Sequence, residues 1–461
     1  GECMLTVINT RLGENRGVPR VWLEGSKLSS SFQIGQKLDI QLDHEKKVAV
    51  LKVAPEGRFS VSKRDRNGRI FPLIEIKDDE LGEMFGDVGV LLRVVVKNGV
   101  ATIEVHGIDR KTAERVDRFN RKVKNGEALT IGSLFSGGGI IDAALHEGLT
   151  KVGINCYTKF IVEQERQYLD TMVANQPELF RDDSILIESG IEFVELKNPP
   201  KVDVLVAGVP CVGASKAGVS KNKISAAEFH ESAGACFFHA LQFIGQCQPG
   251  LIILENVPEY LSSTSMAVIK SVLETWGYEL EVDVLNGNEF GCLENRDRMC
   301  VVATTKGMAK FNMELVKPLL EKPNSVSEIL EDVPLDDSRW KTYQYLVDKE
   351  VRDKKAGKGF KRALLDGTES SVPTIRRLYH KAGSTDTFVK HPDGVLTRLF
   401  TPSEHAALKG VPVKLIHGVS ATVSHEILGQ GVCYPVFTAV GFALGKWASK
   451  ASNDNDMLKT A

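Results

Sequence analysis

Two different patterns of apolar residues divide the chain near residue 110. Before it, short apolar runs alternate with polar positions and are separated by Gly, Asp and Asn turns, which predicts short strands in a small β-barrel or sandwich. After it, fully apolar runs alternate with helical patterns, which predicts parallel βαβ units in a doubly wound sheet. The predicted strands are residues 20–25, 37–42, 47–53, 88–96, 130–135, 159–163, 202–208 and 251–256.

The 461 residues exceed what one hydrophobic core usually serves. Residues 110–127 carry alternating charges and little apolar surface, so we expect a solvated helix or linker there. Residues 318–390 break the strand–helix rhythm with charged segments, which predicts a smaller lobe. The expected domains are 1–107 as a β-barrel-like module, 108–128 as a charged linker, 129–310 with 420–450 as an α/β domain, and 311–419 as the smaller lobe.

Composition narrows the class of protein. The formal net charge is −2, so a nucleic-acid surface would need locally clustered Lys and Arg. The eight cysteines form no CxxC pair, so the sequence predicts no zinc site and favours free thiols in a reducing cytoplasm. No apolar run approaches the roughly 20 residues that span a bilayer.

The segment SLFSGGGIIDAAL (residues 133–145) follows a predicted strand and opens a helix. Bare glycine amides and a helix N-terminus suit a nucleotide-like ligand, although a tight turn alone would also need these glycines. Glu163 ends the next strand, where an acid can accept hydrogen bonds from ribose hydroxyls. A solvent-facing glutamate is the alternative.

Cys211 follows the apolar strand 202–208, at the edge where doubly wound sheets bind ligands. The position suits a nucleophile, although most single cysteines are inert. Glu255 and Asn256 end another apolar strand at the same edge, and an acid there is not needed for packing.

Six motifs follow one another between about Thr130 and Trp447, namely LFSGGGI (134–140), GVPCVGAS (208–215), ENV (255–257), ENRDR (294–298), RLFTPSEHAALKG (398–410) and GQGV (429–432). In these motifs the chain resembles the DNA (cytosine-5) methyltransferase family, and agreement of all six by chance is improbable. The implied fold is a Rossmann-like sheet that uses S-adenosylmethionine, with a small target-recognition domain at 311–419 and the N-terminal all-β module. The implied partner is duplex DNA.

The resemblance also implies roles for individual residues. Cys211 would add to carbon 6 of a flipped cytosine, Glu255 would hold ring nitrogen 3 and the exocyclic amine, and Arg298 would contact the ring oxygen. Arg296 completes the implied catalytic set, and Arg398 with Glu404 would form an internal pair. The implied cofactor contacts are Phe135, Ser136, Gly137, Gly139, Ile140, Glu163, Pro210, Gln430 and Val432. The implied substrate contacts are Ser215, Asn256, Arg376 and Arg377.

The chain departs from the family pattern around these loops. Val212 and Ala214 replace Gln and Phe of the usual catalytic loop, Glu294 replaces the first Gln of the arginine motif, and Gln430 replaces an Asn. The Asp expected after the third strand is missing from LIESGIEF. Three alternatives stay open: a tRNA cytosine methyltransferase, a DNA-binding regulator with impaired catalysis, and a member that uses a modified S-adenosylmethionine.

The smaller lobe is basic, which favours duplex DNA over an RNA hairpin. The candidate phosphate or base contacts are Lys354, Lys355, Lys358, Lys361, Arg362, Arg376, Arg377 and Lys381, with Tyr379 and His380 nearby. The N-terminal module, whose cations include Lys63, Arg64, Arg66 and Arg69, could contact DNA, dimerise or stabilise the chain. We expect a monomeric protein in the cytoplasm of a bacterium, encoded by its chromosome, a phage or a plasmid.

Overall fold

The computed structural model describes residues 3–195, 197–210 and 235–459. Internal contacts divide the chain into two units, Gly1–Glu114 and Arg115–Ala461. Each unit has its own hydrophobic core, and each is described separately below.

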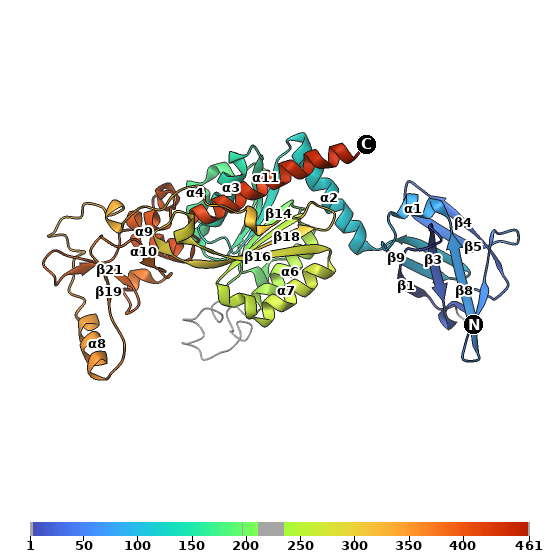
Figure 1. Ribbon diagram of the computed structural model, residues 1–461, viewed down its shortest axis with the longest axis horizontal. Coiled ribbons are helices and arrows are strands. Elements are labelled where there is room, and N and C mark those ends of the chain that lie inside the picture. The colour runs from blue at the N-terminus through green and yellow to red at the C-terminus, as the bar shows by residue number, and fades with distance from the viewer. Residues whose placement is uncertain (1–2, 196, 211–234, 460–461) are drawn as a thin grey trace. The chain divides into compact units, whose positions relative to one another are not determined.

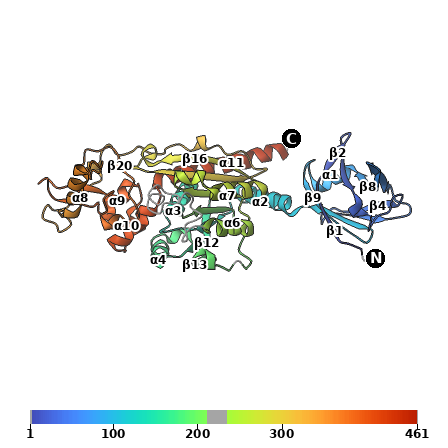
Figure 2. The ribbon, with the colours of Figure 1, turned by 90° about the horizontal axis from the view of Figure 1, so that it is seen from below.

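The N-terminal unit consists of two antiparallel sheets that share one core (Figures 1 and 2). The alternating burial along its strands, for example in β4 and β9, sends every second side chain into that core. Helix α1 (Asp79–Phe85) begins with an Asp78 side chain that accepts a hydrogen bond from the Glu80 amide. In order across the first sheet, the strands are β1 (Thr6–Arg11), β9 (Leu91–Lys97), β10 (Val100–Val105), β5 (Val48–Val53), β4 (Lys37–Asp43) and β6 (Phe59–Ser60). The second sheet is β2 (Gly13–Asn15), β3 (Val18–Glu24), β8 (Arg69–Lys77) and β7 (Ser62–Arg66).

The charged stretch after this unit forms one continuous helix, α2 (Gly107–Asn125). Its C-terminal part, from residue 115 onward, begins with Arg115, which is 1% exposed and donates to the Gln248 side chain and the Trp276 carbonyl. Arg118 and Lys122 form ion pairs of 3.0 and 2.6 Å with the fully buried Asp203. This part of α2 therefore belongs to the second unit, although its composition is that of a solvated helix.

The second unit is built on a seven-stranded sheet in which β11 to β15 are parallel. The chain moves from β11 to β12 on one side and to β14 on the other, so the order reverses next to β11. Such a reversal opens a crevice at the carboxyl ends of the strands. In order, the strands are β13 (Ile185–Glu188), β12 (Cys156–Glu163), β11 (Leu129–Leu134), β14 (Val204–Gly208), β15 (Leu251–Asn256), β18 (Asp297–Thr305) and β16 (Tyr278–Asn286).

Helices cover both faces of this sheet, as the apolar strands require (Figure 1). Val204 and Val206 belong to a core with α3 and α11, whereas Leu205 and Ala207 belong to a core with α6 and α7. The sequence predictions of an α/β sheet and an all-β N-terminal region are confirmed. The helices of this unit are α3 (Ile140–Lys151), α4 (Arg166–Asn175), α6 (Cys236–Cys247), α7 (Thr264–Thr275), α8 (Gln344–Lys355), α9 (Pro402–Leu408), α10 (Ala421–Gln430) and α11 (Tyr434–Lys459).

The smaller lobe contains its own apolar clusters and short sheets. Tyr379, named above as lying near the candidate DNA contacts, belongs to one of these clusters with 0% exposure and is a core residue. The predicted pair of Arg398 and Glu404 is confirmed by two hydrogen bonds of 2.6 and 2.9 Å. The lobe strands are β17 (Glu294–Asn295) with β20 (Val372–Pro373), and β19 (Ala363–Leu365), β21 (Thr387–Lys390) and β22 (Thr397–Arg398).

Within the described ranges, no single helix is both long and apolar enough to cross a membrane. One bent pair, Ala421–Gln430 with Tyr434–Asn453, meets the criteria of length and composition together.

Candidate active site

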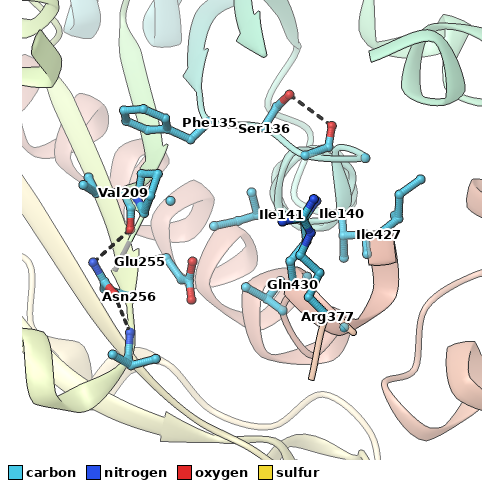
Figure 3. Close-up of a pocket in the computed structure, with 18 of the residues that line it drawn as sticks. Phe135, Ser136, Ile140, Ile141, Val209, Glu255, Asn256, Arg377, Ile427 and Gln430 are labelled. Atoms are coloured by element: carbon cyan, nitrogen blue, oxygen red, sulfur yellow. Dashed lines mark hydrogen bonds between the residues drawn. The ribbon is translucent and has the colours of Figure 1, made fainter. Parts of the chain in front are cut away.

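A cleft of about 1050 Å³ opens at the carboxyl ends of the parallel strands. Its lining includes the residues that follow β11 and end β12, β14 and β15, together with residues of the arginine motif and α10. Figure 3 shows the Glu255 carboxylate directed into the cleft from the β15 side, with Gln430 and Arg377 across from it. The strand order therefore brings together motifs that are far apart in the sequence.

The glycine loop after β11 forms one wall of the cleft. Gly137 and Gly139 have φ angles of 55° and 78°, which glycine adopts without strain. A Cβ atom on Gly137 would lie 2.7 Å from the Gln430 amide nitrogen, and one on Gly139 would lie 2.5 Å from the Met172 sulfur. Phe135 adopts φ 56°, a conformation costly for a side-chain-bearing residue. These conformations keep the loop backbone open toward the cleft.

Glu163 holds this loop from the end of β12. One carboxylate oxygen accepts from the Gly137 amide at 2.6 Å and the other from the Glu165 amide at 2.9 Å. Burial raises the pKa of Glu163 against the lowering effect of these amides. A carboxylate has about four acceptor positions, so Glu163 can still accept a hydrogen bond from a hydroxyl group of a ligand.

Glu255 ends β15, opposite Gly208 in the register of the sheet. A Cβ atom on Gly208 would lie 3.2 Å from a Glu255 oxygen, so the glycine gives the carboxylate room. Arg298 Nε lies 3.3 Å from Glu255 Oε1, and both side chains are largely buried. Burial raises the pKa of Glu255, although the Arg298 and Arg296 charges oppose the rise. A protonated Glu255 can donate a hydrogen bond to a ring nitrogen.

Asn256 follows Glu255 and fixes the strand end. Its amide nitrogen donates to the Val209 carbonyl at 3.0 Å, and its oxygen accepts from the Val257 amide at 2.8 Å (Figure 3). The side chain thereby joins the ends of β14 and β15. Asn256 lines the cleft as predicted for a substrate contact, but these two bonds give it a structural task as well.

Arg296 belongs to a buried charge cluster beside the cleft. Its guanidinium donates to Glu294 at 3.1 Å and to the Ile375 and Gly429 carbonyls at 3.1 and 3.0 Å. Lys409 donates to both Glu294 oxygens at 3.0 and 2.9 Å, and both side chains are fully buried. Burial alone would raise the pKa of Glu294, but the Lys409 and Arg296 charges outweigh burial and lower it. Glu294, which stands where the family usually has Gln, is therefore paired with a buried cation, Lys409.

The two predicted substrate contacts Arg376 and Arg377 both line the cleft and both have protein partners. Arg376 forms two hydrogen bonds of 2.9 and 2.8 Å to Asp386. Arg377 donates to the Tyr168 hydroxyl, which itself donates to Glu426 at 2.7 Å. Arg377 thus connects the lobe to α4 and α10.

Most of the remaining predicted cofactor contacts also line the cleft, namely Phe135, Ser136, Gly137, Ile140, Glu163, Pro210, Gln430 and Val432. Gly139 lies next to Ile140 but is not part of the lining. Cys211, Val212, Ala214 and Ser215 lie outside the described residues, beginning directly after Pro210.

Sequence reasoning missed part of the cleft wall. Ser189, Gly190 and Ile191 line the cleft in the segment where the family's Asp is absent. The Ser189 amide donates to the Glu163 carbonyl at 3.1 Å, which holds this wall beside the end of β12. The sequence shows that the family's Asp is missing from this segment, but no residue pattern in the segment indicates that the backbone of residues 189–191 borders the site. No group of three or more metal-ligating side chains occurs in the described residues.

Comparison with known proteins identifies the family. The model of the C-5 cytosine-specific DNA methylase family matches residues 129–446. The chain is 29% identical to Type II methyltransferase M.SsoII of Shigella sonnei over 262 residues, which cover 55% of this chain and 66% of that protein. It is 30% identical to Type II methyltransferase M.NlaX of Neisseria lactamica over 250 residues, covering 52% and 75%. The chain spans about two thirds of the length of M.SsoII.

A solved structure supports the fold. The S. pombe Dnmt2 methyltransferase superposes with a TM-score of 0.55 at 18% identity, covering 68% of this chain and 98% of that one. The protein is therefore an S-adenosylmethionine-dependent methyltransferase in fold. It belongs to the C-5 cytosine-specific DNA methylase family, so its substrate class is DNA and its methyl donor is S-adenosylmethionine.

The described residues fit this cofactor. At Gly137 the positive φ disfavours a side chain and the Gln430 amide lies where a Cβ would stand, and the loop backbone borders the cleft. Glu163 has acceptor positions left for ribose hydroxyls. Apolar side chains such as Phe135 and Ile140 border the same space.

Proposed function

We propose that this protein methylates carbon 5 of a cytosine in duplex DNA through a covalent adduct with Cys211. The observation that carries the proposal is the buried pair of Glu255 and Arg298, which borders one cleft with the glycine loop. An acid whose pKa is raised by burial is suited to donate a proton at the edge of a base.

The roles of the residues follow from the chemistry of cytosine. Carbon 5 is a poor nucleophile until a thiolate adds to carbon 6, so Cys211 attacks first. Glu255 donates its proton to ring nitrogen 3 and stabilises the charge that the addition creates, and Arg298 binds the ring oxygen. S-adenosylmethionine, when bound, supplies the methyl group for carbon 5. Loss of the carbon 5 proton to a base then restores the ring double bond and expels the Cys211 thiolate.

The target base must leave the DNA stack to reach this cleft, because Glu255 and Arg298 are largely buried. Unstacking costs a few kcal/mol. Arg376 and Arg377, which border the cleft and connect to the lobe, would contact the flipped nucleotide or its neighbours, with Asn256 and Ser215.

The alternatives have less support. The family model is that of DNA methylases and covers residues 129–446 of the second unit, which favours DNA over tRNA. A regulator without catalysis would not need Glu255 and Arg298 as a buried pair. The match of Glu294 with Lys409 accounts for one departure from the family pattern without a change of cofactor.

We further propose a monomeric enzyme of the bacterial cytoplasm, of the kind found in restriction–modification. The similarity to Type II methyltransferases of Shigella sonnei and Neisseria lactamica supports this setting. A chromosomal, phage or plasmid origin is compatible with it.

We propose that the catalytic domain begins within α2 rather than after it. A protein that starts near residue 125 lacks Arg118 and Lys122, which leaves Asp203 buried without these two cations. Such a protein should be insoluble, whereas one that starts at Gly107 should fold and methylate DNA. Purification of both truncated proteins tests this boundary.

The covalent mechanism is tested by transfer of labelled methyl groups to DNA. Cys211→Ser should lose transfer and retain cofactor binding, because a neutral hydroxyl is a much weaker nucleophile than a thiolate. The control Cys236→Ser, which replaces a cysteine of the cleft lining, should remain active. Target DNA with 5-fluorocytosine should trap the wild type covalently, because the fluorine cannot leave as the proton does. Full activity of Cys211→Ser, or no adduct during normal turnover, would refute the mechanism.

A further inference from the structure

The N-terminal unit carries a two-stranded extension that buries no side chain. Every residue from Ser62 to Ile70 is exposed, including all of β7 and the start of β8. Asn67 and Gly68 at its tip have φ angles of 54° and 80°, the conformation of a tight hairpin turn. We call residues 62–70 the basic ribbon. A strand exposed on both faces contributes nothing to the core of its unit, so packing does not explain its sequence.

Three arginines of the basic ribbon lie on one of its faces. Side chains of a strand alternate between faces, so Arg64 and Arg66 point to the same side of β7. Arg69 lies directly opposite Arg66 in the register of the hairpin and joins that side. Like charges directly opposite each other destabilise a hairpin. The three arginines therefore carry a cost in stability that an anionic partner would offset.

One acid accompanies this face. Glu24 on β3 lies 2.7 Å from Arg66 and 3.7 Å from Arg64, so it neutralises part of the charge. The arginines remain 43% and 57% exposed beside it, and their guanidinium groups can still bind a second anion. Glu24 orients the two side chains while leaving a net positive face.

We propose that the basic ribbon is a second DNA-binding surface, which contacts phosphates of duplex DNA outside the methylation site. Guanidinium groups bind phosphate oxygens in a bidentate manner, and a two-stranded β-ribbon fits the major groove. Duplex DNA is the partner because the methylase domain of the same chain binds DNA as its substrate. Bound DNA therefore has a raised local concentration at the ribbon. The inference thus rests on DNA as the substrate class, not on the chemistry of Cys211.

The test uses the full-length protein and a duplex of mixed sequence, with the dissociation constant measured at several NaCl concentrations. The variant Arg64→Gln/Arg66→Gln/Arg69→Gln should bind about ten- to a hundredfold more weakly at low salt, and the salt slope should fall by about 0.9 per lost contact. The control Lys46→Gln/Lys52→Gln/Lys97→Gln removes the same charge from exposed positions elsewhere in this unit and should change neither quantity as strongly.

A second variant acts in the opposite direction. Glu24→Gln removes the acid from the arginine face and should tighten binding and steepen the salt slope. This result also distinguishes DNA contact from misfolding, because a folding defect would not improve binding. Equal losses in the arginine variant and the lysine control, or no response to Glu24→Gln, would overturn the proposal.

Two further measurements separate this proposal from others. Double-stranded RNA of the same length should compete less well than DNA, and preferred binding of RNA through the ribbon would overturn the assignment to DNA. Methyl transfer at saturating DNA should be unchanged in the arginine variant, and a lost rate there would reassign the ribbon to the chemical step. The binding measurements need no methyl transfer, so a failure of the proposed catalytic mechanism would leave this test intact.

Discussion

Two glutamate–arginine pairs, one in the cleft and one beside it, differ in how completely the described residues satisfy their charges. Glu294 accepts from Arg296 and from Lys409 through both of its oxygens and is fully buried. Glu255 forms a longer ion pair of 3.3 Å with Arg298 and keeps 14% of its side chain exposed. The arginine motif of residues 294–298 contains Glu294, Arg296 and Arg298. The Arg296 side chain points into the protein, whereas the Arg298 side chain borders the cleft.

The difference is visible in the pKa values. Neighbouring cations lower the pKa of Glu294 despite its burial, whereas burial raises that of Glu255 despite its arginine. Glu294, whose two oxygens accept from cations, keeps one protonation state and one geometry. Such a fixed carboxylate suits the junction with the lobe. An acid with an elevated pKa can change its protonation during a reaction. Among the described residues, the acid with fewer partners is therefore the candidate for chemistry.

The largest effect is expected when the saturated pair is broken. Glu294→Gln introduces the residue usual in the family but leaves Arg296 and Lys409 as buried cations without an acid. We expect a loss of about 3–5 kcal/mol in the free energy of unfolding. The double variant Glu294→Gln/Lys409→Gln should recover most of it. Urea denaturation of the single and double variants measures this coupling, and a single variant as stable as wild type would contradict the role of Lys409.

Substitution in the pair of Glu255 and Arg298 should lower the rate of methyl transfer rather than the free energy of unfolding. Glu255→Gln is expected to lower methyl transfer at saturating DNA by roughly a hundredfold, equivalent to about 2.7 kcal/mol, because the amide cannot donate an acidic proton. Glu279→Gln, at an exposed position of the same sheet, is the control and should keep the wild-type rate. A change confined to DNA affinity would reassign Glu255 to binding.

The two arginines provide a smaller and more specific contrast. Arg296→Lys loses the fork that reaches Glu294 and the Ile375 and Gly429 carbonyls, so stability should fall by about 1.5–3 kcal/mol. Arg298→Lys should reduce the rate of methyl transfer while unfolding stays near wild type. The rate of methyl transfer and the free energy of unfolding in urea are measured for both variants. A loss of stability in Arg298→Lys, with a loss of rate alone in Arg296→Lys, would contradict the comparison.

The smallest effects concern pH and have opposite signs. The pKa of Glu255 is raised in the folded protein, so its contribution to stability is present below pH 4.5, the ordinary glutamate value, and is lost as pH rises through the folded pKa. The pKa of Glu294 is lowered, so its contribution is present above pH 4.5 and is lost as pH falls through the folded pKa. Unfolding of Glu255→Gln and Glu294→Gln relative to wild type at several pH values measures both signs, and parallel profiles would contradict the comparison.

Strands β12, β14 and β15 of the central sheet were predictable because they are apolar on both faces and end in Glu, Gly or Asn. The predicted strand 251–256 matches β15 residue for residue, and the acid at its end lies in the cleft. Lys409 was not predictable as a partner of Glu294, since 115 residues separate them and a lysine in a charged helical segment usually faces solvent. Arg115 was missed for the same reason, because tertiary contacts bury it within a helix of polar composition.

Exchange of the smaller lobe between relatives is constrained by the separation of Glu294 and Lys409 along the chain. Glu294 lies before the expected lobe of residues 311–419, and Lys409 lies inside it, although the two meet in the buried cluster. A chimera that replaces the whole expected lobe would therefore remove Lys409 from this ion pair. A graft that ends at Phe400 keeps both residues of the recipient. The functional boundary for such exchange is set by buried charge rather than by the end of the lobe.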